Sequence, residues 1–190
     1  YLPFEAITVL RSGSIELVAR NVETLLGFVG VDPTVVTGPD GLRSTFVFFA
    51  ADGHRLTTRV VLACTGIGSI SIVAGLTMAV DAAPKRKALG IALAVPIIYG
   101  LNVLRVAFIA LAHGFQWFAG FRGPIFTLFG IEDPYLVSYI VADRVISQSA
   151  SVIALVLITL GLLRLVPELG TVVEDVLFLL TGTEYDLELG

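Results

Sequence analysis

Three long apolar segments dominate the pattern of hydrophobic and polar positions along the chain. They cover residues 60–80, 88–112 and 145–166 and carry almost no charge. A helix needs about 20 apolar residues to cross the hydrocarbon core of a bilayer, which is about 30 Å thick. The pattern therefore predicts three membrane-spanning helices, the second of them kinked at Pro96.

A shorter amphipathic pattern precedes these segments. From Ser14 onward, apolar residues recur at helical spacing, which predicts a helix that lies on the membrane surface or on other helices. Its predicted apolar face consists of Ile15, Val18, Val22, Leu25, Leu26 and Val29. Ser12 or Ser14 is expected to cap its start, and residues 1–10 are expected to be the tail of an earlier membrane helix. A second short amphipathic helix is predicted at residues 171–180.

The stretches between these helices have patterns of their own. Residues 31–42 are rich in Pro, Gly and Asp and are expected to form a loop. Residues 44–59 surround a turn at Asp52 and Gly53, which predicts a small β-hairpin that serves as a structural lid, with His54 on its surface. Residues 113–143 are rich in aromatic residues, which suits the membrane interface, and are expected to form one or two short helices.

The composition indicates a membrane protein. Of the 190 residues, 56% are hydrophobic and only 15% are charged, which is too little charge to solvate the surface of a soluble domain. The formal net charge of −4 disfavours nucleic acid as a partner. We therefore expect a mainly α-helical, multi-pass bundle in the cell membrane, with residues 1–190 forming a single membrane-embedded domain. Because residue 1 is Tyr rather than Met, we expect the chain to be trimmed at its start.

A basic cluster at residues 85–87 lies between the first two predicted spans and sets their orientation. Basic loops favour the cytoplasmic side, so the hairpin and the far ends of these spans are expected outside the cell. Measured from the cytoplasmic ends at about 1.5 Å per residue, Cys64 lies at about 24 Å and Arg105 at about 26 Å. Arg144 stands at the outer end of the third span. The three residues are therefore expected to meet near the extracellular face.

Cys64 is the one cysteine of the chain, so by itself it forms no internal disulfide and no thiolate metal site. It is either an inert packing residue or a reactive thiol. A cysteine in the first turns of a helix lies where the helix dipole favours the thiolate. Its predicted helix face also carries a stripe of small residues, which marks a side that packs on other helices. The members of that stripe are Gly68, Ser71, Gly75 and Ala79.

Two arginines complete the candidate site. Arg105 lies deep in a predicted membrane helix at a cost of about 2.5–3.5 kcal/mol, so it needs a partner or a cavity. Asn102 lies one turn earlier on the same face and is expected to hold its guanidinium group. Asp143 does not share the predicted face of its neighbour Arg144. That face continues into the membrane with polar residues and indicates a water-accessible cleft, through Ser147, Gln148 and Ser151.

Each of these residues also has an ordinary structural interpretation. Arg105 can form a structural ion pair or extend to the lipid headgroups, and Arg144 can be an interfacial anchor. His113 lies on a face similar to that of Arg105, is expected at the membrane interface, and is the candidate if the chemistry needs a neutral base.

A thiol beside two guanidinium groups fits acyl transfer. Only the thiolate of a cysteine is a good nucleophile, and nearby positive charge favours the thiolate. Arginine stays protonated, so its useful roles are to hold the thiolate and to donate hydrogen bonds to an oxyanion. Acyl transfer through a thioester, on a substrate that arrives at the outer membrane face, is the reaction class that these residues favour.

The sequences ACTG at residues 63–66 and NVLR at residues 102–105, followed by Arg144, resemble the exosortase/archaeosortase family. Most of that family has His at the third position, and Arg there resembles its archaeosortase A branch. The resemblance covers residues 60–166 and implies a membrane cysteine transpeptidase whose catalytic part is this chain. It implies two partners, a C-terminal signal of precursor surface proteins with a Pro-Gly-Phe motif and a membrane lipid as acceptor.

Carried over from the family, Cys64 is the nucleophile, Arg105 stabilises the thiolate or the oxyanion, and Arg144 takes the third catalytic position. Asn102, His113 and Gln148 are candidate supporting residues. Because Arg144 replaces the usual His, the proton acceptor remains open between water and His113. No metal or other cofactor is expected.

Two other function classes also fit the sequence. A transporter or channel module would use Arg105 and Arg144 to bind an anion, and Cys64 would then be dispensable. A structural membrane subunit would tolerate neutral replacement of all three residues. A thiol redox enzyme is disfavoured, because the sequence offers no second cysteine to resolve a mixed disulfide.

Overall fold

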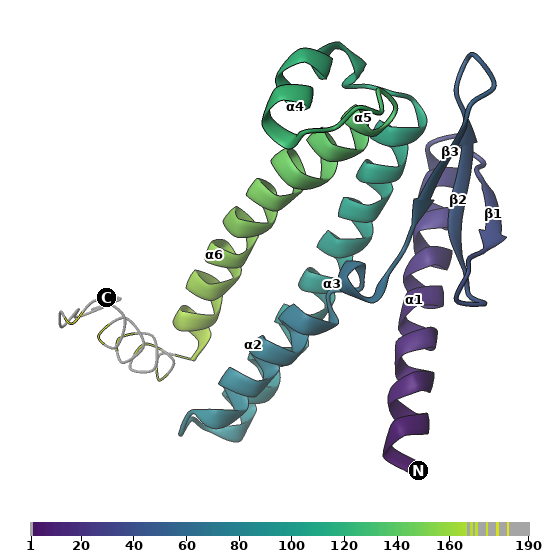
Figure 1. Ribbon diagram of the computed structural model, residues 1–190. Helices are drawn as coiled ribbons and strands as arrows, with labels where there is room; N and C mark the ends of the chain where they lie inside the picture. The colour runs from purple at the N-terminus through teal and green to yellow at the C-terminus, as the bar shows by residue number, and fades with distance from the viewer. Residues whose placement is uncertain are drawn as a thin grey trace. The chain divides into compact units, whose positions relative to one another are not determined.

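The computed structural model describes residues 2–166 and, further along, residues 168, 170, 174, 178 and 182, with side chains described from residue 8 onward. The described chain is mainly helical and contains one small sheet (Figure 1). It divides into two compact units. The first comprises Tyr1–Gly66 and Gly100–Ala150, and the second comprises Ile67–Tyr99 and Ser151–Gly190.

The first unit begins with one long helix, α1 (Leu2–Phe28). It joins residues 1–10 and the predicted amphipathic segment into a single helix of 27 residues. The predicted cap is wrong, because the hydroxyl groups of Ser12 and Ser14 donate to backbone carbonyls of the preceding turn. The amphipathic pattern did identify the packed face, since four of its six predicted members are buried, namely Ile15, Val18, Val22 and Leu26.

α1 packs against a three-stranded antiparallel sheet with the strand order β1-β2-β3 (Figure 1). β2 (Arg43–Phe49) and β3 (Arg55–Arg59) form the predicted hairpin, with Phe46 opposite Thr58. β1 (Thr34–Thr37) pairs with the other edge of β2, within a stretch that the sequence predicts to be a loop. All four residues of β1 are β-branched, which favours a strand. The stretch was nevertheless predicted to be a loop, because Pro, Gly and Asp residues surround these four.

The first predicted span is not a continuous helix. Residues 60–80 instead contain a 3-10 turn, η1 (Leu62–Cys64), and a helix of 13 residues, α2 (Ile67–Ala79). Gly66 separates them, because its φ of +75° is left-handed and does not continue a right-handed helix. Thirteen residues rise by about 20 Å, which is short of a hydrocarbon core of about 30 Å.

Two helices among the described residues are long and apolar enough to cross a membrane. The first is α3 (Pro84–Gly114), which continues through Pro96 and extends the predicted second span at both ends. The second, Leu136–Leu165, combines α5 (Leu136–Ile140), a π-helical segment η3 (Val141–Ser147) and α6 (Gln148–Leu165). Arg144 therefore lies inside this long helix rather than at its head.

Short helices connect these two long ones, as the sequence predicts. They are η2 (Ala119–Phe121) and α4 (Arg122–Phe129), which lead toward α5. Several aromatic side chains in this connection are more than half exposed, namely Phe115, Trp117 and Phe121. Exposed aromatic residues of this kind suit the membrane interface.

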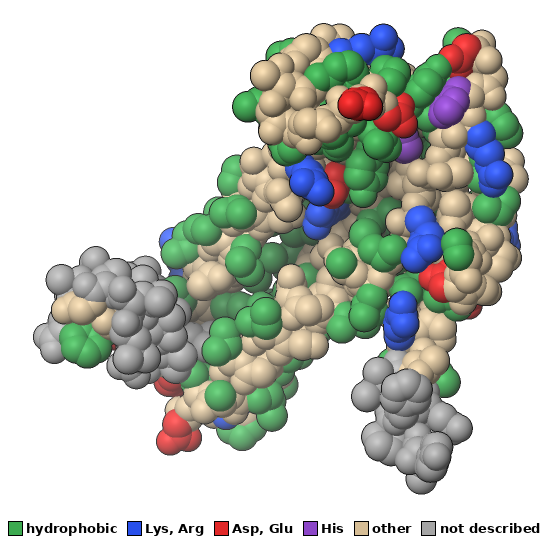
Figure 2. Space-filling view, viewed as in Figure 1, with side chains coloured by type: hydrophobic (Ala, Val, Ile, Leu, Met, Phe, Trp, Pro, Cys, Tyr) green, Lys and Arg blue, Asp and Glu red, His purple; other side chains and the backbone are tan. Residues whose placement is uncertain are grey.

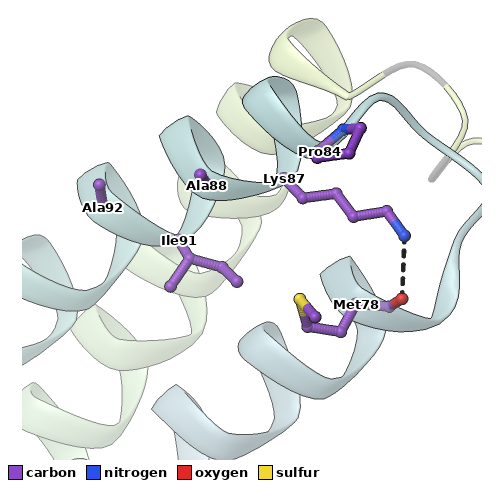
Figure 3. A pocket seen from close by; sticks show the side chains of 6 residues that line it. All are labelled: Met78, Pro84, Lys87, Ala88, Ile91 and Ala92. Carbon is purple, nitrogen blue, oxygen red and sulfur yellow. Dashed lines mark hydrogen bonds between the residues drawn. The ribbon is translucent and has the colours of Figure 1, made fainter.

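The second unit has an apolar core built from α2, α3, α6 and the residues at their ends. Its buried members are Val73, Val80, Ala94, Ile98, Leu162, Leu163 and Val166. An apolar groove at one end of α2 and α3 is closed on one side by Lys87, whose Nζ donates to the carbonyl of Met78 at 3.1 Å (Figure 3).

The surface of α6 in this unit is rich in apolar side chains that face outward (Figure 2). Val152, Ile153 and Leu157 are each more than half exposed, as expected of a helix that faces lipid. Of the amphipathic helix predicted at residues 171–180, only Glu174 and Phe178 are described, so the rest of that prediction lies outside the described residues.

Candidate active site

Cys64 stands at the end of the η1 turn in the first unit. The hydroxyl of Thr65 donates to the carbonyl of Leu62 at 2.7 Å, and backbone hydrogen bonds close the same turn. Cys64 is half-buried and forms no disulfide. Because the turn precedes α2, Cys64 lies outside the helix predicted to carry it and shares no helix face with the small residues of α2. A short, hydrogen-bonded turn presents the thiol instead.

α3 reaches this turn through Asn102. A Cβ atom built on Gly66 would lie only 2.5 Å from Nδ2 of Asn102, so the amide group occupies the space that a side chain at position 66 would need. Gly66 is therefore required twice, for its positive φ and for this close approach. The contact ties the Cys64 turn to the face of α3 that also carries Arg105.

Arg105 is held by Asp143 from the π-helical segment η3. Nη2 of Arg105 donates to Oδ1 of Asp143 at 2.8 Å, and both side chains are about one quarter exposed. Asp143 was not among the predicted site residues, because its position next to Arg144 gives no sign that it pairs with Arg105 on the preceding span. The signal was available, since an arginine deep in a membrane helix needs a partner and Asp143 is an acid at the corresponding depth.

Arg144 is exposed on the neighbouring position of η3. Among the described residues, no hydrogen bond or ion pair engages its guanidinium group. The predicted polar face is only partly continuous, because Ser147 is buried whereas Gln148 is exposed. A π-helical turn contains an extra residue and is frequent at functional sites. It breaks the regular α-helical spacing on which that predicted face rests.

Tyr139 of α5 lies among these groups and was not singled out from the sequence. The charges of Cys64, Arg105, Asp143 and Arg144 all act on its hydroxyl group, which places the four within electrostatic range of one point in the first unit. Figure 2 shows basic and acidic side chains next to one another in this part of the surface.

His113 is buried between the sheet and α5. Its side chain is 4% exposed, and its Nδ1 lies 3.0 Å from Oγ1 of Thr58 on β3. Its ring also meets the ring of Tyr139 edge-on, with the centroids 5.6 Å apart. His113 therefore connects the sheet to α5. No group of three potential metal ligands occurs among the residues that the structure describes.

The tip of the hairpin contacts the segment that leads into α5. The ring of His54 stacks on the ring of Tyr135 with centroids 4.1 Å apart, and the hydroxyl of Tyr135 donates to Asp52. This hydrogen bond lowers the pKa of Asp52 and raises the pKa of Tyr135. The contact fixes the hairpin, through its tip, to the chain that carries Tyr139, Asp143 and Arg144.

Comparison with known proteins shows the family to which this chain is similar. Residues 1–133 match the transmembrane exosortase family. Archaeosortase A of Haloferax volcanii is 48% identical over 202 residues, an alignment that covers all of this chain and 66% of the relative. Archaeosortase A of Natronomonas pharaonis is 44% identical over 184 residues, with 93% of this chain and 58% of the relative covered. No solved structure matches the chain.

The chain spans less than two thirds of the length of these two curated relatives. The family match nevertheless extends through α1, the sheet, the Cys64 turn and α3, which includes Asn102 and Arg105. It ends before η3, so Asp143 and Arg144 lie beyond it, within the part aligned with the two relatives. The resemblance read from the two short motifs is confirmed, and the chain belongs to the transmembrane exosortase family of membrane proteins.

Proposed function

We propose that this chain is the catalytic part of a membrane cysteine transpeptidase that processes precursor surface proteins at a C-terminal signal. One observation carries the proposal: the turn that presents the half-buried Cys64 meets α3 at Asn102, one helical turn before Arg105. Arg105 in turn pairs with Asp143, the neighbour of the exposed Arg144. A lone thiol with two permanent cations nearby suits nucleophilic attack on a carbonyl and stabilisation of the charge that follows.

In the proposed reaction, the thiolate of Cys64 attacks the scissile carbonyl carbon and forms a tetrahedral oxyanion. Arg105 and Arg144 stabilise the thiolate and then the oxyanion by charge and hydrogen bonding. The carbon–nitrogen bond breaks, and the leaving amine takes up the proton that the thiol lost. A hydroxyl group of a membrane lipid then attacks the thioester, transfers its proton through water and releases Cys64 as a thiol.

The proposed substrate carries a Pro-Gly-Phe motif followed by a membrane helix, as the family resemblance implies. The proposed site lies at the extracellular face of the membrane, where an exported precursor is available. His113 is an unsuitable proton acceptor, because it is buried against Thr58 and Tyr139. Water is the better candidate, since Arg144 is exposed beside the site.

The first test is Cys64→Ala in cells that carry the full-length enzyme and a precursor with the Pro-Gly-Phe signal. We expect the unprocessed precursor to accumulate while the variant enzyme remains in the membrane. Arg105→Lys and Arg144→Lys are expected to slow processing about 10²–10³-fold, the usual loss when one oxyanion donor is removed. Arg43→Lys is the matched control, because Arg43 is exposed and pairs with Glu23 outside the site.

Normal processing by Cys64→Ala would contradict the transpeptidase proposal. If Cys64→Ala were silent while the two arginine variants failed, an anion-binding module would account for the site instead. If all three variants were silent, the residues would be structural.

A further inference from the structure

We propose that Asp143 is a positioning residue of this site, which fixes the Arg105 guanidinium group for catalysis. The inference rests on the proposed function and adds a residue that neither short motif contains. Four ion pairs occur among the described side chains. The pair of Arg105 with Asp143 shares the shortest separation, 2.8 Å, with one other, and it is the most buried of the four.

Burial changes what such a pair does. An exposed pair is screened by water, and its loss affects little. Arg105 and Asp143 are 27% and 22% exposed, so removal of the carboxylate leaves a cation in a poorly solvated place. The guanidinium group would then turn toward water or the lipid headgroups, away from the position that the pair defines.

The remaining donors of Arg105 show why its orientation matters. Only Nη2 contacts Asp143, and Nε is buried without a hydrogen-bond partner among the described residues. Because a guanidinium group is planar and rigid, fixing Nη2 also fixes the direction of Nε–H. A buried donor without an acceptor is costly and uncommon, and a catalytic role is one of the reasons for which proteins retain one. In the proposed reaction its acceptor is the thiolate or the oxyanion.

The backbone around the pair supports the same role. Asn102, three residues before Arg105 on α3, lies against Gly66 directly after the Cys64 turn. Arg105 is thus anchored from two sides, by the contact of its helix with the Cys64 turn and by Asp143 on η3. Asp143 also balances the charge of Arg105, whereas the neighbouring Arg144 forms no ion pair with any residue that the structure describes.

The test compares Asp143→Asn and Asp143→Glu in the full-length enzyme, with processing of the Pro-Gly-Phe precursor measured per enzyme molecule in the membrane. A positioning role predicts that kcat falls about 10²-fold for Asp143→Asn, the loss typical of a catalytic group misplaced by about 1 Å, while KM changes little. Asp143→Glu keeps a carboxylate on a longer side chain and is expected to recover about tenfold of that loss, which leaves kcat about tenfold below the wild type.

Glu23→Gln is the matched control, because it breaks an ion pair of the same length in the same unit, at an exposed site. It is expected to process the precursor at the wild-type rate. Wild-type kcat for Asp143→Asn, or an equal loss in Glu23→Gln, would overturn the inference.

If Asp143→Asn does not accumulate in the membrane, Asp143→Glu decides the question. A reduced kcat supports positioning, whereas a wild-type kcat shows that the pair is only structural. Cys64→Ala, measured alongside, separates the two proposals. If it still processes the precursor, the proposed function fails. If it does not, and Asp143→Asn is as fast as the wild type, only the positioning role fails.

Discussion

Replacement of Gly66 by Ala tests how much the backbone conformation and close packing next to Cys64 contribute to stability. Gly66 has a φ of +75°, where an L-residue with a side chain costs roughly 1–2 kcal/mol. The new methyl group would also lie 2.5 Å from Nδ2 of Asn102, and overpacking of this kind typically costs about 1–3 kcal/mol. We therefore expect Gly66→Ala to lower the free energy of unfolding by about 2–5 kcal/mol, the sum of these two ranges.

Gly30→Ala is the matched control for the backbone part of this cost. Gly30 has a φ of +78°, but nothing lies within 4 Å of a Cβ atom built there, so only about 1–2 kcal/mol is expected. The assay is denaturant unfolding of the purified full-length protein in detergent. Combining Gly66→Ala with Asn102→Ala should recover the clash, about 1–3 kcal/mol, and leave the backbone cost. Equal losses in Gly66→Ala and Gly30→Ala would refute the close approach of Asn102.

Two further predictions concern the surroundings of the site. Gly114→Ala would place a methyl group 2.6 Å from the ring of Phe48, so it should destabilise the protein by about 1–3 kcal/mol, whereas Gly100→Ala on the same helix, with open space around it, should be neutral or stabilising by thermal unfolding. The hydrogen bond from Tyr135 is the main cause of the lowered pKa of Asp52. This hydrogen bond therefore stabilises the folded hairpin tip at any pH above the ordinary carboxyl pKa. The stabilisation is lost as the pH falls through the lowered pKa of Asp52. The protection factors of amides at the tip, which correct for the intrinsic slowing of exchange in acid, should therefore fall below about pH 4 in the wild type and not in Asp52→Asn, and equal acid responses would contradict this.

The long helix α3 was predictable because the mean hydropathy of a membrane span is summed over many residues. A single residue such as Pro96 does not change that sum enough to alter the prediction, and Pro96 did not end the helix. Residues 60–80 are also apolar but contain Gly66, which has a left-handed φ and lies against Asn102 on another helix. Hydropathy depends only on residue types and not on such a contact. The helix within residues 60–80 was therefore predicted to be longer than it is.

In the candidate site, too, some residues were predictable from the sequence and others were not. Cys64, Arg105 and Arg144 stood out because a thiol and cations are rare in apolar segments, and short motifs around them resemble a known family. Asp143 did not stand out because its partner, Arg105, lies 38 residues away on another helix, and sequence spacing does not reveal such a pair. Tyr139 gave no signal of its own, because a tyrosine in an aromatic-rich segment resembles its neighbours.

Because of the π-helical segment η3, the number of residues in the helix Leu136–Leu165 determines where Asp143 and Arg144 point. In a regular α-helix each residue turns the chain by about 100°. Deleting one residue from Val141–Ser147 and restoring regular α-helix would change the direction in which Asp143 and Arg144 point, relative to α6, by about that angle. Point substitutions on the lipid-facing side of α6 should therefore be tolerated more readily than a single-residue deletion or insertion in η3. In this family, gaps in aligned sequences are expected to avoid the seven residues of that turn.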